Sequence, residues 1–213
     1  MLIAFDFDGT LSDSEMTVLL GEQASVAEKI DDITRRAMND ELSYAESLYA
    51  RAKLLDDLPE ADAEAAFERV RLRPGAVAVV AALREAGHHV AVLTGGFEVG
   101  VERALSAEGV DVDTVVANRL PVRNGKLTGE ARGPLIEGTK DDALDDLAGE
   151  VGVEMADTVA VGDGANDLPM LEVAGLAVGY EPKPAVESHC DVVVESMAEL
   201  RELLTERGVI PAV

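Results

Sequence analysis

Short apolar runs rich in β-branched residues alternate with helical patterns along most of the chain, and this alternation constrains the fold more than any other feature. Strands that alternate with helices form parallel sheets covered by helices. The 213 residues suffice for one such α/β core with a small inserted module. The predicted strands are Leu2–Phe7, His89–Leu93, Thr114–Asn118, Thr158–Val161, Leu176–Val178 and Val192–Val194, and the helical patterns include Gly75–Ala86 and Phe97–Glu108.

One long segment interrupts the alternation after the first predicted strand. From Glu15 to about Arg71 the pattern is helical throughout, which is too long for a single crossover between two strands. We therefore expect a small helical cap over residues 14–72, inserted into a core made of residues 1–13 and 73–213. Ligands of such sheets bind at the carboxyl ends of the strands, so a cap that begins there covers the site.

Two local patterns add detail to this division. Ser43 and Glu46 form the capping-box pattern SYAE, which predicts the start of a helix that continues through Leu55. The dipeptide Asn124–Gly125 lies between two short alternating runs and predicts a two-residue β-hairpin after the third strand.

Carboxylates follow two of the predicted strands directly. Asp6 and Asp8 end the run LIAFDFD and share one face of it, because side chains alternate along a strand. Asp163 and Asp167 follow the run TVAVG in the same way. An aspartate turn explains Asp8 but not Asp6, and a buried unpaired carboxylate is costly, so a cation is expected beside them. An all-oxygen set suits Mg²⁺, and no twelve-residue calcium loop is present.

Two further features fit an anion in the same place. Thr94, Gly95 and Gly96 follow the second strand and precede a helix, where a hydroxyl and unhindered backbone N–H groups bind anions. Lys140 follows Thr139, whose position predicts a helix N-cap, and a lysine in a first turn opposes the helix dipole. The alternative interpretations are an ordinary strand-to-helix turn and a lysine paired with its acidic neighbours on the surface.

The motifs DFDGT, TGG, a lysine and GDGAND, in this order, resemble those of the haloacid dehalogenase superfamily of aspartate-nucleophile phosphatases. The resemblance covers nearly the whole chain and implies a Rossmann-like core with a cap. It implies that Asp6 attacks phosphorus, and that Asp8 protonates the leaving oxygen and then activates water. It implies a Mg²⁺ ion held by the carboxylates of Asp6 and Asp163 and by the carbonyl oxygen of Asp8.

The resemblance also implies roles for the residues around the phosphate. Thr94, Gly95 and Lys140 are expected to bind the phosphoryl oxygens, together with Gly96. Asp167 is expected to orient Lys140 and a metal-bound water, and Asn166 to contact the phosphate. The chain has Gly9 and Thr94 where the most similar branch of the family often has serine.

That branch acts on phosphoserine, and two cap residues carry the likeness. Glu15 and Arg51 match the pair that holds the ammonium and carboxylate of the amino acid. The helix neighbours of Arg51 include no acid, which suits a bidentate ligand carboxylate. A snorkelling arginine and a glutamate that favours the helix dipole are the alternatives. Tyr44 and Met38 are interpreted as cap packing, with Tyr44 a further candidate for lining the pocket.

The expected reaction is hydrolysis of O-phosphoserine to serine and phosphate, the last step of serine biosynthesis. The first alternative is another small phosphate ester, such as phosphohomoserine or a sugar phosphate, or transfer to an acceptor alcohol. The second is a non-enzymatic acidic protein on the same fold, and the intact Asp6, Asp8, Lys140 and Asp163 count against it.

Composition bears on surroundings more than on chemistry. The chain has 42 acidic and 18 basic residues, a net charge of −24, which excludes nucleic acid and anionic membranes as partners. Evenly spread acid with scarce lysine is typical of proteins from salt-accumulating halophiles, with an ordinary acidic protein as the alternative.

Further features of the sequence favour the cytoplasm. The single Cys190 fits a reducing interior, no run is long enough to span a membrane, and the start is unlike a signal peptide. No additional regulatory domain is expected before the first strand. The sequence leaves monomer and homodimer undecided.

Overall fold

The computed structural model describes residues 1–38 and 41–212, with the side chain of Met38 outside the description. Its central feature is a parallel sheet in the order β3-β2-β1-β6-β7-β8. These strands are β1 Leu2–Phe5, β2 His89–Phe97, β3 Thr114–Asn118, β6 Thr158–Gly162, β7 Leu176–Tyr180 and β8 Val192–Val194. The predicted α/β fold with a parallel sheet is confirmed.

Strand β1 lies inside the sheet, and both of its faces are buried. It is apolar throughout and pairs with β2 on one side and β6 on the other, so that Phe5 is opposite both Val92 and Val161. Ile3 and Phe5 belong to one apolar core, and Leu2 and Ala4 belong to the other. A strand that reads as a continuous apolar run is expected in a sheet covered on both faces.

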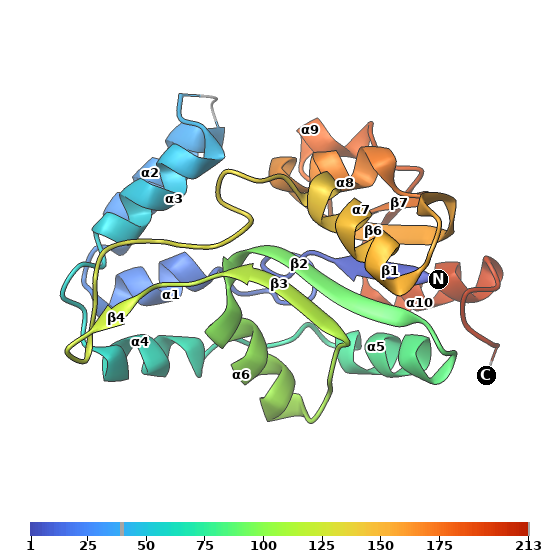
Figure 1. Cartoon of the computed structure of the whole chain (residues 1–213), viewed down its shortest axis with the longest axis horizontal. Helices are drawn as coiled ribbons and strands as arrows, with labels where there is room; N and C mark the ends of the chain where they lie inside the picture. Colours follow the sequence, from blue (N-terminus) through green and yellow to red (C-terminus); the bar gives the residue numbers. More distant parts are fainter. Residues whose placement is uncertain (39–40, 213) are drawn as a thin grey trace.

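Helices cover the two faces of the sheet as separate layers (Figure 1). The first layer supplies Val79, Val101 and Leu200 to the core around Phe5, and the second supplies Leu144 to the core around Ala4. The first layer consists of α5 Ala76–Glu85, α6 Glu98–Glu108 and α10 Met197–Glu206. The second consists of α7 Lys140–Val151, α8 Leu168–Val173 and α9 Pro184–Glu187.

The segment between β1 and α5 folds into helices beside the sheet (Figure 1). Ser43 caps α3 with the predicted capping box, its hydroxyl accepting from the N–H of Glu46. Leu20, Ile30 and Leu48 from three of these helices pack in the same apolar core as Phe5, which joins the helices to the sheet. The helices are α1 Met16–Gln23, α2 Ala27–Met38, α3 Tyr44–Lys53 and α4 Glu60–Phe67.

The predicted hairpin is present and is attached to these helices. Strands β4 Val122–Arg123 and β5 Lys126–Leu127 pair antiparallel around Asn124–Gly125, both of which have positive φ. Two backbone bonds join Leu127 to the segment between α3 and α4, one from its own N–H to Leu58 O (2.9 Å) and one to its oxygen from Asp57 N–H (3.1 Å).

Some boundaries differ from the prediction. Strand β1 ends at Phe5, α3 ends at Lys53, and β2 continues to Phe97 instead of ending at Leu93. The register between β2 and β3 shifts after Leu93, so Phe97 pairs with Asn118. The stretch Thr94–Gly96 continues β2 as an irregularity between these two pairs, and α6 begins only at Glu98, so the interpretation of that stretch as a strand-to-helix turn is wrong.

The chain passes between the core and the helical segment twice, at adjacent places. Ser12 and Leu72 form an antiparallel bridge, and the hydroxyl of Ser12 donates to Arg71 O at 2.7 Å. The predicted division at residues 14–72 lies at this crossing. Among the described residues, no helix has the length and apolar character needed to cross a membrane.

Candidate active site

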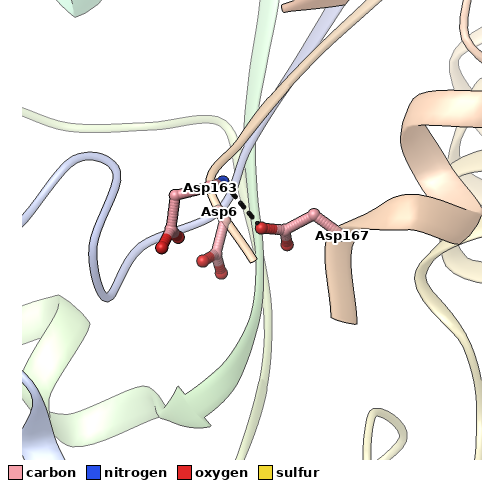
Figure 2. Close-up of side chains that lie close together, drawn as sticks. All are labelled: Asp6, Asp163 and Asp167. Atoms are coloured by element: carbon pink, nitrogen blue, oxygen red, sulfur yellow. Dashed lines mark hydrogen bonds between the residues drawn. The ribbon is translucent and has the colours of Figure 1, made fainter. Parts of the chain in front are cut away.

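Three aspartates meet at the carboxyl ends of β1 and β6 (Figure 2). Carboxylate oxygens of Asp6, Asp163 and Asp167 lie within 4.8 Å of one another, and all three side chains are buried. The N–H of Asp6 donates to Val161 O at 2.9 Å, which extends the pairing of β1 and β6 beyond the end of the strand. The sheet itself therefore brings together residues that are far apart in the sequence.

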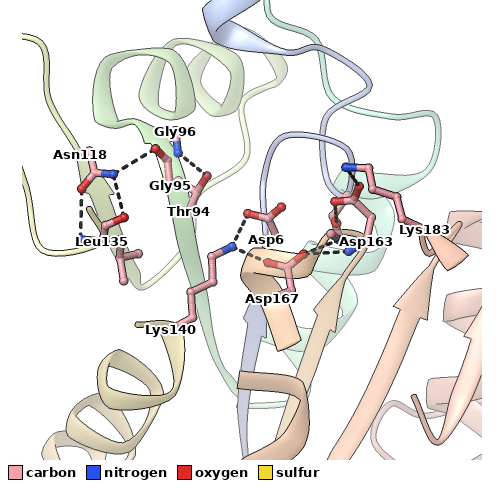
Figure 3. A network of polar contacts seen from close by, with 12 residues as sticks. Asp6, Thr94, Gly95, Gly96, Asn118, Leu135, Lys140, Asp163, Asp167 and Lys183 are labelled. Atoms are coloured by element: carbon pink, nitrogen blue, oxygen red, sulfur yellow. Dashed lines mark hydrogen bonds and ion pairs between the residues drawn. The ribbon is translucent and has the colours of Figure 1, made fainter. Parts of the chain in front are cut away.

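Lys140 neutralises part of this cluster from the first turn of α7. Its buried Nζ lies 2.6 Å from Oδ1 of Asp6 and 2.5 Å from Oδ1 of Asp167 (Figure 3). Thr139 occupies the N-cap position as predicted, but its side chain makes no cap hydrogen bond. The two carboxylates hold the lysine where the helix dipole disfavours it, so the surface ion-pair alternative is wrong.

Asp167 has both of its oxygens engaged. Oδ2 accepts from the N–H groups of Asp163 and Gly164, each at 2.9 Å, while Oδ1 faces Lys140. These contacts fit a residue that orients Lys140 and the loop better than one that binds a metal directly, although Asp167 belongs to the geometric cluster.

Burial and mutual repulsion shift the acids of the site. Desolvation, with repulsion from Asp167, raises the pKa of Asp6 to about 7 although Lys140 opposes the shift. Desolvation also raises the pKa of Asp163, opposed by Lys183. Burial alone would lower the pKa of the Lys140 ammonium, but the negative charges of Asp167 and Asp6 raise it above its ordinary value.

Asp8 is placed to carry a proton. Burial, followed by repulsion from Glu15 and Asp6, raises the pKa of Asp8 well above its usual range. Oδ2 accepts from the N–H of Met16 at 3.3 Å, whereas the buried Oδ1 has no hydrogen-bond partner among the described residues. A protonated carboxyl with an unused oxygen suits a general acid.

The donor set fits a divalent cation. Five carboxylates face three cationic groups, which leaves an excess of two negative charges when all are ionised. Burial first, and then repulsion from Asp167, raises the pKa of Asp6 and of Asp163, and a cation bound beside them would favour their ionised forms. Hard oxygen ligands of this kind suit Mg²⁺. The acids are Asp6, Asp8, Glu15, Asp163 and Asp167, and the cations are Arg51, Lys140 and Lys183.

The end of β2 forms the opposite wall of the site. The hydroxyl of buried Thr94 accepts from the N–H of Gly96 at 3.0 Å. A Cβ added to Gly96 would lie 3.2 Å from Oδ2 of Asp8, so glycine allows this backbone to approach the acid closely. The stretch 94–96 therefore lies where the sequence predicted a phosphate site, although within a strand.

Asn118 holds this wall in place and was not identified from the sequence. Its buried side-chain amide donates to Gly95 O (3.0 Å) and Leu135 O (3.2 Å) and accepts from Leu135 N–H (3.1 Å) (Figure 3). Its position as the last residue of a predicted strand was the available signal, because polar residues at strand ends mark the ligand edge of a parallel sheet.

A cavity of about 350 Å³ opens beside this wall, between the core and α3. Lys140, Asn166, Gly95 and Tyr44 are among its lining residues. A Cβ on Gly95 would lie 1.8 Å from the hydroxyl oxygen of Tyr44, so the phenol packs directly against this backbone, and burial raises its pKa to about 12. Tyr44 therefore lines a cavity beside the site, and its role in lining the substrate pocket stays a prediction.

Arg51 and Glu15 lie on the cap side of the same site. Arg51 is buried, and its guanidinium donates to Thr17 Oγ1 (3.1 Å) and Ser47 O (3.3 Å). No acid lies within ion-pair distance of it among the described residues, and burial lowers its pKa although Tyr44, Glu15 and Asp8 oppose the shift. A buried guanidinium held only by neutral groups has capacity for a bidentate anion.

Glu15 is exposed at the N-cap of α1. Desolvation by the surrounding protein raises the pKa of Glu15, and the positive charges of Lys183 and Arg51 oppose that shift. Because the side chain is exposed, solvent screens these interactions. Lys183, which sequence reasoning missed, lies 3.0 Å from Oδ2 of Asp163 and donates its backbone N–H to Asp163 O at 2.9 Å. The scarcity of lysine in an acidic chain is the signal that could have drawn attention to it.

Together, fold and site define an α/β enzyme in which aspartates and a lysine meet at the carboxyl ends of a parallel sheet, beside a helical cap. The chain belongs to the family of haloacid dehalogenase-like hydrolases, whose family model matches residues 3–172.

Relatives of known activity match the chain over nearly its full length. It is 53% identical over 208 residues to the phosphoserine phosphatase of Halobacterium salinarum, covering 98% of this chain and 99% of that protein. It is 39% identical over 204 residues to the phosphoserine phosphatase of Methanocaldococcus jannaschii, covering 95% of each.

Solved structures agree with these relatives. A phospho-aspartyl intermediate analogue of phosphoserine phosphatase superposes with a TM-score of 0.88 at 39% identity, covering 96% of this chain and 97% of the other. A substrate-bound phosphoserine phosphatase gives the same TM-score and coverage at 38% identity.

Proposed function

We propose that this chain is a Mg²⁺-dependent phosphoserine phosphatase, which hydrolyses O-phosphoserine to serine and phosphate as the last step of serine biosynthesis. The observation that carries the proposal is that the buried site around Asp6 and Lys140 lies beside a cap whose buried Arg51 has no acidic partner among the described residues. The names and structures of the relatives support it. A cytoplasmic location fits such a biosynthetic reaction.

In the first step, a carboxylate oxygen of Asp6 attacks phosphorus and the bond from phosphorus to the serine oxygen breaks. Asp8 donates its proton to that oxygen, so serine leaves as a neutral alcohol. The raised pKa of Asp8 supplies the proton near neutral pH. The enzyme then carries phosphate as an acyl phosphate on Asp6.

In the second step, the ionised Asp8 removes a proton from water. The water oxygen attacks phosphorus, and the bond to Asp6 breaks, which restores both carboxyl groups to their starting states. Use of one residue as acid and then base keeps the proton balance closed within each turnover.

A Mg²⁺ ion would be held by the carboxylates of Asp6 and Asp163 and the carbonyl oxygen of Asp8. When bound, it supplies positive charge that offsets the repulsion between carboxylate and phosphate. The excess negative charge and the raised pKa values of Asp6 and Asp163 support this assignment. Asp167 keeps Lys140 oriented through a direct ion pair.

The phosphoryl oxygens would be bound by Thr94, the N–H of Gly95 and Lys140, with Gly96 and Asn166 beside them. Lys140 reaches the nucleophile at 2.6 Å, so its ammonium lies next to the attacked group. Asn166 and Lys140 line one cavity, which supports contact with the same ligand. Fixed donors of this kind stabilise charge that grows in the transition state.

The amino-acid end of the substrate would be bound by the cap. Arg51 would pair with the carboxylate and Glu15 with the ammonium. Substrate binding would satisfy a buried guanidinium whose hydrogen-bond partners, in the part of the chain that the structure describes, are a hydroxyl and a carbonyl oxygen. The cap would also exclude water while the acyl phosphate forms.

The proposal is tested by product analysis. The folded protein is incubated with O-phospho-L-serine and Mg²⁺ in molar KCl, with glycerol present as an acceptor alcohol. We expect serine and inorganic phosphate in equal amounts. Serine without equal phosphate, with phosphoglycerol formed instead, would reassign the protein as a phosphotransferase. Absence of serine altogether would refute the proposed activity.

A further inference from the structure

Arg73 contacts the loop that follows β1, residues 6–12, at the point where the chain returns from the cap to the core. Its backbone N–H donates to Leu11 O at 2.8 Å, and Nη2 of its side chain donates to Gly9 O at 3.0 Å. Gly9 follows Asp8 directly, so the guanidinium is one peptide away from the proposed general acid.

The same guanidinium is anchored at the carboxyl end of β7. Nη1 lies 2.7 Å from Oε2 of Glu181, and the guanidinium carbon lies 4.8 Å from the centre of the Tyr180 ring. Tyr180 ends β7, and the N–H of Glu181 donates to Val194 O at 2.9 Å, so one partner lies in the sheet and the other is bonded to its last strand. Cation–π and ion-pair contacts together fix a guanidinium in one orientation.

Arg73 differs in burial from the arginines that form surface ion pairs. Its side chain is 21% exposed, whereas the side chain of Arg69, in an ion pair on the cap, is 47% exposed. Its Nε is buried without a hydrogen-bond partner among the described residues. The largely desolvated guanidinium is therefore held by several contacts together, with Gly9, Tyr180 and Glu181, and not by one weak exposed ion pair.

The loop that Arg73 holds has little freedom to move. Gly9 has φ +87°, its N–H donates to Ser12 O at 2.9 Å, and its carbonyl oxygen accepts from Arg73. A Cβ at Gly9 would lie 2.7 Å from Oδ1 of Asp163. Gly9 therefore lies between the proposed acid and a proposed metal ligand, and a shift of this peptide displaces the acid.

We propose that Arg73 is a positioning residue for phosphoryl transfer: through the carbonyl oxygen of Gly9 it sets the place of Asp8 relative to the leaving oxygen. This inference rests on the proposed function. A misplacement of about 1 Å costs on the order of 100-fold in rate, so loss of the contact is expected to lower kcat about 10- to 100-fold. KM is expected to change little, because Glu15 and Arg51 make no contact with Arg73.

Arg84 provides a matched control. It also joins a backbone oxygen to a carboxylate, with Asp111 O at 3.3 Å and Oδ1 of Asp113 at 3.2 Å, but it lies in the last turn of the core helix α5 and, in the described part of the chain, has no hydrogen bond to the loop after β1. Arg84→Met removes the same types of contact without touching the loop. A role of Arg73 in folding alone would make the two arginine variants behave alike.

The kinetic test measures kcat and KM for O-phosphoserine in Arg73→Met, Arg73→Lys, Glu181→Gln and Arg84→Met. We expect kcat to fall 10- to 100-fold in Arg73→Met, less in Arg73→Lys, and less than twofold in Glu181→Gln and Arg84→Met, with KM within about threefold throughout. An unchanged kcat in Arg73→Met overturns the proposal. An equal loss in Glu181→Gln overturns the assignment to the Gly9 contact. If Arg73→Met fails to fold, Arg73→Lys and Glu181→Gln still give this comparison.

Hydrogen exchange tests the contact without any catalysis. The N–H groups of Gly9 and Ser12 are bonded within the loop, the latter to Phe7 O at 2.9 Å. We expect their exchange to be at least tenfold faster in Arg73→Met than in the wild type and unchanged in Arg84→Met. Unchanged exchange in Arg73→Met overturns the proposal. This measurement separates the proposed function from the proposed contact. A wild type without phosphatase activity would refute the function, whereas exchange would still show whether Arg73 holds the loop.

Discussion

The core and the cap hold their charged groups in different ways. In the core, Lys140 is bound by two carboxylates from different elements, and Asp167 accepts three hydrogen bonds. In the cap, Arg51 is also buried, but among the described residues it donates hydrogen bonds only to a hydroxyl and a carbonyl oxygen, and Glu15 is exposed. In the core, the protein itself pairs the buried lysine with acids before any substrate binds, whereas in the cap we expect a ligand to supply the acid that Arg51 lacks.

This difference separates chemistry from specificity. A buried network with satisfied partners is rigid, so we expect Asp6, the proposed nucleophile, and Lys140 to keep their geometry when substrate binds. A buried cation without an acidic partner gains most from a ligand carboxylate. Changes in the core are therefore expected to lower turnover, and changes in the cap to alter which ester is bound.

The largest expected effect is that of Asp6→Asn. An amide is a poor nucleophile, so turnover of O-phosphoserine is expected to fall by more than about 10⁴-fold while substrate still binds. The same substitution at the exposed Asp13 is the matched control. Phosphate release at a normal rate from the Asp6 variant would show that the core does not supply the nucleophile.

Arg51→Met tests the cap half of the comparison. Loss of one partner of a buried charge pair costs about 2–5 kcal/mol, so KM for O-phosphoserine is expected to rise roughly 30- to 5,000-fold with a smaller change in kcat. Arg69→Met, which removes an exposed cap ion pair with Glu22, serves as the control. A fall in kcat at unchanged KM would mean that Arg51 acts on the chemistry and not on recognition.

Salt is expected to act on core and cap alike, because both carry the acidic excess of a chain with net charge −24. Concentrated counterions screen this self-repulsion, so we expect cooperative folding to require molar KCl. The measurement is the thermal midpoint, followed by circular dichroism from dilute buffer to molar KCl. A cooperative melt that is the same in dilute buffer would contradict this expectation.

A smaller effect, confined to the core, is the pH dependence of stabilisation by Mg²⁺. Asp6 titrates near pH 7 when folded and near its ordinary 3.8 when unfolded, so the metal-free fold binds more protons between these values. Its stability therefore falls as pH rises through that window. Mg²⁺ competes with these protons, so it should stabilise the protein more at pH 8 than at pH 5.

At a hundredfold excess over Kd the gain is about 2.7 kcal/mol, which corresponds to a rise in Tm of roughly 5–10 °C. Melting curves with and without Mg²⁺ at both pH values measure it. Asp163→Asn is expected to reduce the shift at pH 8, whereas Asp13→Asn is expected to leave it intact. Equal shifts at pH 5 and pH 8 would remove the link between Mg²⁺ and the buried carboxyls.

The sequence predicts the parts of the site that depend on local order. Asp6 and Asp163 follow apolar strands, and parallel pairing necessarily brings such strand ends together, so their meeting was predictable. The hairpin at Asn124–Gly125 and the capping box at Ser43 depend on neighbouring residues alone, and both are present.

The parts that could not be predicted depend on contacts between distant segments. The continuation of β2 past Leu93 depends on the pair between Phe97 and Asn118 of β3, across an irregularity that no local preference encodes. Asn118 bonds to Gly95 and Leu135, and Arg73 bonds to Gly9 and Glu181, across separations that a single sequence does not reveal. The roles proposed for Glu15 and Arg51 could not be derived from residue spacing either, because they depend on contacts with a ligand.

The most direct test of the division between core and cap is kcat/KM for a panel of phosphate esters that differ at one end only. O-phosphoserine, phosphoethanolamine without the carboxylate and 3-phosphoglycerate without the ammonium are compared with Mg²⁺ and then with EDTA, in high salt. We predict that phosphoserine is preferred by orders of magnitude and that EDTA abolishes turnover of every ester. Similar values for all three esters would contradict the assigned role of the cap, and full activity in EDTA would contradict the metal-dependent core.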